Sequence, residues 1–430
     1  MILLTFSFYL LLVVLLTWLS SRGIVLILII SWWGIWNFLS YFSISGIQII
    51  DIDTQFVYFL FFASITAAYI SFERISQKWK NRSFNFSNVK SLYKILFWLA
   101  ICVLLPVQIF FVFRAIYILT FIMPPGMYRN DVFGLITGTS TLFFNSNALA
   151  LLHSLVIGPF QYIYLFTGLS YYLLRRKLGL ILIGVTLIIL DAVMMFGRFG
   201  YHFLIVTLLF GLIFTAYFSG ISKLTRHSLK LIAAFSFLVL FSLFITLNKG
   251  NEGMIEILKT FVVTYHTESF AIFDLELRNP NSILHNYTYG LSTIGGVERY
   301  WTLVLNKLSY PIVSQTDIVG AYLHQNFVIG QDSYGRPLLF NAFGSIFFTM
   351  YRDGGLVAIF GFGTIFGFLL SYYSISINTR DPYRFSMLLG LVYILIYGIF
   401  QPSTLGPMLP AFVFIFLLHL CSQIYSRVKD

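Results

Sequence analysis

Two arginines of this chain lie beside glycines at the ends of apolar segments. Arg198 lies in the segment FGRFG and Arg352 in the segment YRDGG. An arginine side chain stays charged and presents a planar set of donors that fits phosphate. Glycine lets the backbone approach a ligand closely. The pattern therefore indicates a binding site for a phosphate or diphosphate group.

Arg129 and Arg114 are two further candidates for the same site. Arg129 lies in a short polar segment, whereas Arg114 lies inside an apolar one. A charge within an apolar segment marks either a functional site or a structural ion pair, and Asp191 could be the partner of Arg114. All these arginines could alternatively extend toward lipid headgroups or pair with acidic residues.

Histidine and carboxylate side chains supply candidates for proton transfer. His266 and Glu268 lie together in the segment TYHTES, and Asp353 directly follows Arg352. Such groups can accept the proton of an attacking hydroxyl, so we predict these three as catalytic. The same part of the chain holds further candidates, namely Glu252, Asp274, Glu276, His285, Glu298 and His324. Each of them could equally be a solvated loop residue.

Two residues are candidates for binding a substrate. His202 comes four residues after Arg198, so a helix would place both on one face. Tyr289 could stack on a sugar ring, although aromatic residues also gather at membrane interfaces without binding a ligand.

The composition shows which elements must position these residues. The chain has 430 residues, of which 58% are apolar and only 10% are charged, against about 25% charged in an average soluble domain. This excludes a soluble globular protein and a disordered chain. The two cysteines, Cys102 and Cys421, offer neither a disulfide framework nor metal-ligand spacing. The sequence also lacks a phosphate-binding loop for ATP, so we expect no metal and no cofactor.

Apolar stretches that could span a bilayer recur along the whole chain. They fall at about 2–19, 24–43, 55–72, 95–122, 148–174, 178–196, 201–218, 231–248, 355–377, 385–401 and 408–424. Backbone polar groups must be paired in lipid, which favours helices. The predicted fold is therefore all-α, a polytopic integral membrane protein with about 11 transmembrane helices.

Lysine and arginine residues predict the orientation in the membrane. If the basic segment 73–94 is cytoplasmic, 17 of the 27 Lys and Arg residues lie inside and nine outside, as the positive-inside rule requires. The N-terminus is then outside and the C-terminus inside. The net charge of +11 follows from this topology, so we expect no nucleic-acid partner.

One segment between the predicted spans, residues 249–354, is far longer than the others. Loops longer than about 15 residues usually carry function or structure of their own. We predict short helices here that lie at the membrane surface or re-enter it. This gives three parts: a membrane bundle of about eight helices (1–248), a large outer loop (249–354) and a bundle of about three helices (355–430).

The end of this loop resembles bacterial oligosaccharide repeat-unit polymerases, the Wzy-type O-antigen and capsule polymerases. The matching residues are the NAFG segment that begins at Asn341, followed by Tyr351 and Arg352 in YRDGGL before an apolar span. Arg352 and Gly363 also match an R-x10-G pattern of that family. The region of Arg198 is similar to an earlier outer loop of the family.

The match around Arg198 is less complete than the match around Arg352. The next glycine in its span is Gly211, which gives R-x12-G in place of R-x10-G. The overall layout, with about eleven spans and one large late loop, is also similar to that of the family.

The resemblance implies a GT-C-like glycosyltransferase of the bacterial inner membrane. Its donor and acceptor would be oligosaccharides linked to undecaprenyl diphosphate, joined at the periplasmic face without a metal ion. Arg198, Arg352, Arg129 and Arg114 would hold the diphosphate. Tyr351, His202, Asn341 and Tyr289 would contact the substrate. A flippase and a chain-length regulator would be possible partners, besides membrane lipid.

Two rival enzymes fit parts of the same pattern. Asp51 and Asp53 form a D-x-D, which can bind a divalent cation and is typical of polyprenyl-phosphate-dependent glycosyltransferases. The surrounding loop has only about 11 residues, which is short for such an enzyme. An O-antigen-ligase-like enzyme would also need arginines and a long outer loop.

Two other classes of membrane protein remain alternatives. A flippase or transporter for a lipid-linked oligosaccharide would carry polar sites inside the membrane, whereas here polar residues concentrate in the loops. A structural membrane protein would not need arginines on its outer side.

Overall fold

The computed structural model describes residues 1–44, 46–76, 89–132, 140–197, 199–219, 236, 263–331, 335–340 and 344–429. Packing divides the chain into two compact units. The first joins residues 1–84 with 253–413, and the second joins residues 85–252 with 414–430. The predicted three parts are continuous stretches of chain, whereas these units are defined by contacts. The long segment after residue 253 is grouped with the first three helices.

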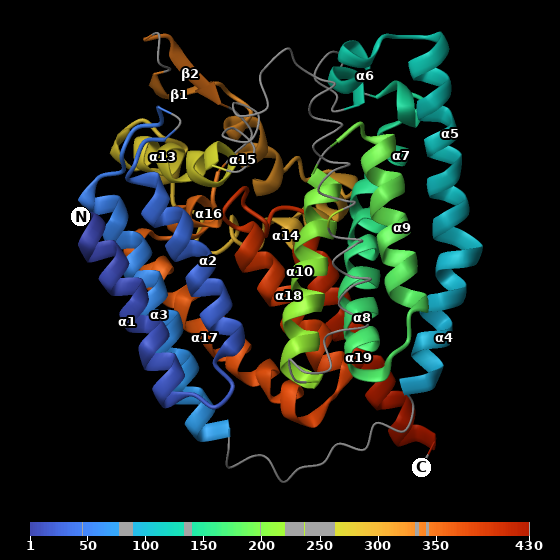
Figure 1. The fold of residues 1–430 in the computed structure, drawn as a ribbon. Helices are drawn as coiled ribbons and strands as arrows, with labels where there is room; N and C mark the ends of the chain where they lie inside the picture. The colour runs from blue at the N-terminus through green and yellow to red at the C-terminus, as the bar shows by residue number, and fades with distance from the viewer. Residues whose placement is uncertain are drawn as a thin grey trace. The chain divides into compact units, whose positions relative to one another are not determined.

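Five apolar helices form the body of the first unit (Figure 1). They are α1 (Ile2–Leu19), α2 (Ile24–Ser40), α3 (Ile52–Ser76), α17 (Gly355–Thr379) and α18 (Pro382–Tyr397). Trp33 of α2 donates its indole N–H to the carbonyl of Leu395 in α18, at 2.8 Å. Asp381 caps the start of α18 by accepting a hydrogen bond from the Tyr383 amide, and Pro382 occupies the first turn.

Glycines allow α3 and α17 to pack closely. A Cβ atom at Gly363 would lie 1.9 Å from Ser64 Oγ, and one at Gly367 would lie 2.3 Å from the Ile65 carbonyl oxygen. These two glycines form a G-x-x-x-G pattern, which brings helix backbones together in membrane proteins. The Gly363 that contributes to the family resemblance therefore has a packing role in this fold.

The long segment folds into short helices and one β-hairpin. The helices are α13 (Tyr265–Arg278), α14 (Gly295–Lys307), α15 (Gln315–Leu323) and α16 (Ile346–Arg352), with a 3₁₀ turn at Ile283–His285. The short helices agree with the sequence prediction, and the hairpin was not predicted. Its strands, β1 (Phe327–Gln331) and β2 (Pro337–Phe340), pair antiparallel, and Ile47 bridges to Gly330. A Cβ atom at Gly330 would lie 2.1 Å from the Gly46 carbonyl oxygen, so this pairing requires glycine.

The second unit consists of apolar helices and a short helical cap. Its elements are α4 (Val89–Leu99), α5 (Leu105–Phe121), α6 (Pro125–Val132), α7 (Asn147–Leu152), α8 (Gly158–Arg175), α9 (Gly179–Met194) and α10 (Phe199–Ser219). The C-terminal α19 (Met408–Lys429) begins in the first unit and continues in the second. A π-helical turn precedes each of Pro106 and Pro159, because proline offers no amide hydrogen to the preceding turn.

The helices agree with the predicted membrane class. Among the described residues, six are long and apolar enough to cross a membrane: α1, α3, α4–α5, α7–α8, α10 and α17. The apolar helices α2, α9, α18 and α19 are shorter. Predicted span 231–248 lies outside the described residues except for residue 236, and each of the other predicted spans coincides with a helix. This architecture is compatible with an all-α, multi-pass membrane protein.

Candidate functional site

Arg352 is the last residue of α16, and the interior of the first unit holds this helix in place. Phe347 of α16 lies in an aromatic cluster with Trp33, Tyr58 and Phe61, at ring-centre distances of 4.5–5.2 Å. The amide of Ile346 donates to the Gly398 carbonyl at 2.6 Å. The helix therefore fixes the position of Arg352, whose side chain is almost fully buried with 5% of its residue surface exposed.

The guanidinium of Arg352 donates only to neutral oxygen atoms. Its Nε donates to the Ile283 carbonyl at 3.2 Å, and its Nη1 donates to Ser292 Oγ at 3.2 Å and to Gln315 Oε1 at 2.8 Å. Arg352 forms no ion pair with any of the described residues. Burial lowers the pKa of the Arg352 guanidinium, and the nearby Asp353 charge opposes this effect.

A buried cation is costly unless it is paired with an opposite charge. Neutral dipoles solvate this guanidinium, and the nearby Asp353 charge acts on it without forming an ion pair. The planar fork of a guanidinium has the shape that suits a phosphate oxygen pair.

Asp353 is buried and holds the loop 286–294 in place. Its carboxylate accepts hydrogen bonds from Thr288 Oγ1, from the Ser292 amide at 3.0 Å and from the Thr293 amide at 2.8 Å. Both oxygens are therefore used to fix the loop that supplies Ser292 to Arg352. This geometry favours a positioning role for Asp353 over the predicted role as a proton acceptor.

The same loop presents Tyr289 to its surroundings. Tyr289 is 86% exposed and has a left-handed backbone, with φ of 51°. The loop packs against the start of α17, where Gly355 also has a positive φ of 62° and a Cβ would lie 2.9 Å from Tyr287 Oη. Tyr289, which we predicted to bind substrate, therefore has an exposed aromatic ring on a fixed loop beside Arg352.

Tyr351 connects this corner with α13. Its ring centre lies 6.0 Å from that of Phe273 and 6.4 Å from that of His285. Burial raises the pKa of the Tyr351 hydroxyl, so this hydroxyl remains a neutral hydrogen-bond donor. Tyr351, Arg352, Asp353 and the loop of Tyr289 thus meet at one place in the first unit.

His266 and Glu268 lie in the first half of α13 and are both buried. The ring of His266 stacks on Trp36 at 3.9 Å and contacts Phe400 at 4.6 Å. Glu268 is 0% exposed, and neither of its carboxyl oxygens has a hydrogen-bond partner among the described residues. Burial raises the pKa of the Glu268 carboxyl well above its usual range. Burial in this position therefore favours the protonated form of the carboxyl over the ionised one.

The Arg352 corner is our name for the place where Tyr351, Arg352, Asp353 and the loop 286–294 meet. Glu268 is separated from this corner along α13. It precedes Phe273 by five residues, which is about 7.5 Å along a helix axis. The two other acidic residues of α13 are used in the fold. Asp274 accepts from the Asp51 amide at 2.9 Å and from Thr54 Oγ1 at 2.7 Å. Glu276 accepts from the hydroxyls of Ser282 and Tyr322.

Asp51 and Asp53 form the D-x-D that is typical of polyprenyl-phosphate-dependent glycosyltransferases, and they lie at the start of α3. Both are exposed, and the Asp51 carboxylate accepts from the Ile52 amide. Acidic residues stabilise the N-terminal end of a helix, which accounts for this pair. Across the described residues, no three His, Cys, Asp or Glu side chains are grouped as a metal site would need.

The remaining predicted residues of the site belong to the second unit or lie outside the described residues. Arg114 donates to the carbonyls of Leu142 at 2.8 Å and Thr141 at 2.7 Å, and stacks on Phe144. Arg114 of α5 is therefore bonded to the 3₁₀ turn Thr141–Phe143. The predicted partner Asp191 instead contacts His153 at 3.0 Å.

Arg129 is exposed on α6, and His202 lies half-buried in α10. Both belong to the second unit, so the site described above is built from the first unit alone. Arg198 and Asn341 lie outside the described residues.

Gln315 and Ser292 are the site residues that sequence reasoning missed. Ser314 caps α15 by accepting a hydrogen bond from the Asp317 amide at 3.1 Å, and the S-x-x-D pattern is a signal for such a helix start. The pattern could have located Gln315 at the first turn of a helix. Its contact with Arg352, 37 residues further along the chain, could not have been read from local sequence.

Comparisons with known proteins identify no relative of this chain. No family model, no curated protein and no solved structure matches the chain.

Proposed function

We propose that the chain is a polymerase that joins oligosaccharide repeat units carried on undecaprenyl diphosphate. The reaction is a metal-independent glycosyl transfer at the periplasmic face of a bacterial inner membrane. It yields an O-antigen or capsular polysaccharide. The observation that carries this proposal is the buried Arg352 guanidinium, which has only neutral hydrogen-bond partners among the described residues.

In the proposed reaction, a hydroxyl of the acceptor sugar attacks the anomeric carbon of the donor sugar. The bond between that carbon and the diphosphate oxygen breaks, and undecaprenyl diphosphate leaves with the electron pair. Arg352 stabilises the negative charge that develops on the leaving oxygen.

The proton of the attacking hydroxyl goes to a residue of α13. His266 and Glu268 are the two candidates, and both are buried in the first unit. Burial raises the pKa of the Glu268 carboxyl, so its role as a base requires a bound substrate that stabilises the ionised form. Tyr351 and Tyr289 contact the sugar rings in this proposal.

The energy for transfer comes from the sugar–diphosphate bond. This agrees with the absence of an ATP-binding loop from the sequence. Membrane lipid surrounds the helices, and a flippase and a chain-length regulator are proposed as partners that deliver units and set the chain length.

The proposal is tested by surface polysaccharide from a strain that lacks this chain. We expect a ladder of chain lengths to collapse to a single repeat unit, because units are still made, moved across the membrane and attached. Complementation with the native chain should restore the ladder. Complete loss of the repeat unit from the surface would contradict the proposal and would indicate a flippase, a ligase or an earlier transferase.

A further inference from the structure

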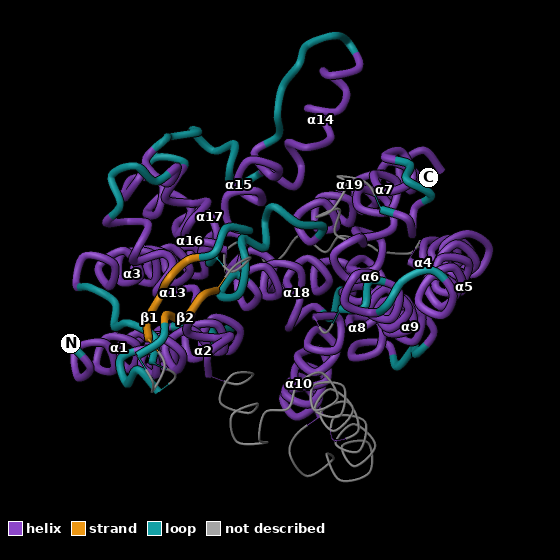
Figure 2. Tube along the Cα trace, turned by 90° about the horizontal axis from the view of Figure 1, so that it is seen from above, coloured by secondary structure: helices purple, strands orange, loops and turns teal. Residues whose placement is uncertain are grey.

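An apolar surface lies where α14 passes into the loop before α15. Trp301 is 68% exposed, Leu308 is 62% exposed and Val313 is 63% exposed. Together with the exposed Val304, Tyr310 and Ile312, these residues form what we name the α14 corner. Seen from above, α14 and the loop project beyond the neighbouring helices of the first unit (Figure 2).

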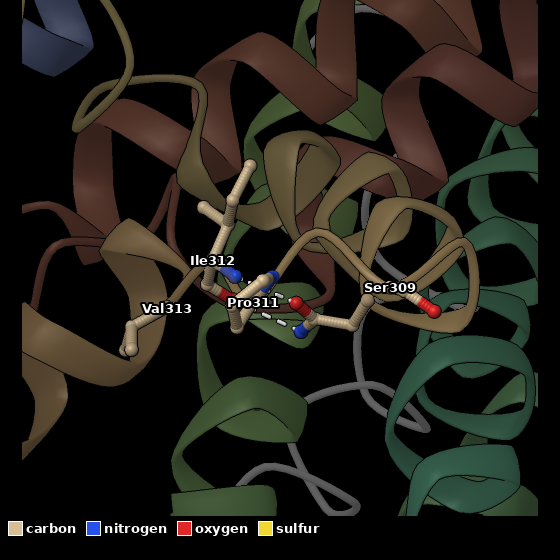
Figure 3. Close-up of a pocket in the computed structure, with 5 residues that line it drawn as sticks. Ser309, Pro311, Ile312 and Val313 are labelled. Atoms are coloured by element: carbon tan, nitrogen blue, oxygen red, sulfur yellow. Dashed lines mark hydrogen bonds between the residues drawn. The ribbon is translucent and has the colours of Figure 1, made fainter.

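A specific set of hydrogen bonds holds the loop of the α14 corner. The Asn306 side chain donates to the Ile312 carbonyl at 3.0 Å and accepts from the Ile312 amide at 2.7 Å. The Tyr310 amide donates to the Leu305 carbonyl at 3.0 Å. Asn306 also borders an open pocket of about 510 Å³. The other lining residues, Ser309, Pro311, Ile312 and Val313, are labelled in Figure 3. The apolar side chains are therefore presented by a fixed loop.

Three polar residues of α14, Glu298, Arg299 and Thr302, bond to other residues of the protein, whereas Asn306 and Lys307 are exposed. Thr302 is buried and donates to the Glu298 carbonyl. The Glu298 carboxylate accepts from the Gln315 amide at 3.0 Å, and Arg299 pairs with Asp317 at 3.2 Å. A surface helix in water usually directs its apolar residues inward, whereas α14 exposes Trp301 and Val304.

We propose that the α14 corner lies in the interface of the lipid bilayer, with its apolar side chains at the boundary between headgroups and acyl chains. The long apolar helices of the same unit also expose apolar side chains, for example Val357 and Ile365 of α17. Trp301, Tyr310 and the exposed Lys307 are residue types that favour this boundary.

The α14 corner also relates the bilayer surface to the candidate site. Gln315 follows Val313 by two residues, at most about 7 Å along the chain, and its side chain contacts Arg352. A lipid-bound corner thus holds the guanidinium near the depth of the headgroups. This inference does not depend on the proposed reaction.

Spin labels on the full-length chain in phosphatidylcholine–phosphatidylglycerol vesicles test the proposal. The exposed native cysteines, Cys102 and Cys421, are first replaced by serine. Labels are then attached singly at Val304→Cys, Leu308→Cys and Val313→Cys. Ile365→Cys on the spanning α17 is the lipid control, and the exposed polar Asn281→Cys is the water control.

We expect the three corner labels to resemble Ile365→Cys, with frequent collisions with dissolved oxygen and few with a water-soluble nickel complex. Nickel collisions as frequent as those of Asn281→Cys would overturn the proposal. Low collision rates with both reagents would also overturn it, because protein from the second unit or another copy would then cover the corner. Three separate exposed positions keep the result independent of any single variant.

Discussion

At the scale of single residues, the charge of Arg352 decides what the candidate site can bind. Its hydrogen-bond partners among the described residues are a carbonyl, a hydroxyl and an amide oxygen, and the nearby Asp353 charge acts on it without forming an ion pair. Arg114 also has neutral partners, two carbonyls and an aromatic ring of the second unit, but it is only half-buried.

Arg352→Lys should reduce chain growth by about 10²-fold, the usual effect of removing one oxyanion donor. Lysine keeps the charge but cannot reproduce the planar fork. The readout is polysaccharide length at equal protein level. Arg299→Lys is the matched control, since Arg299 already pairs with Asp317 and surface pairs contribute little. A full-length ladder with Arg352→Lys would remove Arg352 from the mechanism.

Gln315 gives a test of whether neutrality around Arg352 matters. Gln315→Glu has nearly the same shape but would pair with the guanidinium, whereas Gln315→Ala removes one hydrogen bond and leaves the charge available. We expect Gln315→Glu to be the less active variant by about 10-fold or more, the equivalent of one charge-assisted hydrogen bond. A purely structural role would give the opposite order, with alanine the worse replacement.

Glu268 should make stability depend on pH. Its folded-state pKa is raised, so the folded protein binds the proton more tightly than the unfolded chain does. Stability is then highest below the unfolded pKa of about 4.3 and falls as pH rises toward the folded pKa.

Glu268→Gln should remove this loss and raise Tm at pH 7.5 relative to the native chain, by about 2–4 °C for each kcal/mol recovered, with little difference at pH 4.5. Melting in detergent at several pH values measures this. The exposed Asp53→Asn controls for the loss of one carboxylate. A Tm difference that does not change with pH would contradict the assignment.

At the scale of elements, close packing of α3 on α17 fixes the start of the helix that follows Arg352. Gly363→Ala would place a Cβ 1.9 Å from Ser64 Oγ, and overpacking of this kind costs about 1–3 kcal/mol. We therefore expect a lower Tm. Gly361→Ala, two residues earlier in the same helix and with no atom within 4 Å of its Cβ, should be neutral or stabilising. Equal effects of the two substitutions would rule out the tight contact.

The sequence predicted the helices far better than their contacts. Runs of apolar residues are local, so α1, α3 and α17 could be located before the structure was known. The partners of Arg352 lie 37 to 69 residues away, and no local pattern encodes them. The hairpin of β1 and β2 is also long-range in part, since Ile47 completes it.

The site predictions show the same difference between local patterns and long-range contacts. Residue types suggested Arg352 and Glu268 as candidates, and the structure shows that both are buried. Residue types could not show that the Asp353 carboxylate accepts hydrogen bonds from amides of the loop 286–294. They also could not show that Asp191 contacts His153 in place of Arg114.

At the scale of the whole molecule, the long segment after residue 253 forms one compact unit with the first three helices. The Arg352 corner, the loop of Tyr289 and the buried α13 residues all lie in that unit. Apolar helices on either side of the long segment are compatible with a site at a membrane surface, where both substrates of the proposed reaction are anchored.

Reconstitution tests the central claim most directly. The purified chain in lipid vesicles is supplied with undecaprenyl-diphosphate-linked repeat units, without nucleotide, and the length of the lipid-linked glycan is measured. The account predicts products of two or more repeats, release of undecaprenyl diphosphate, and loss of both with Arg352→Ala. Products that remain single repeat units, with a chain that is correctly folded and inserted, would contradict it.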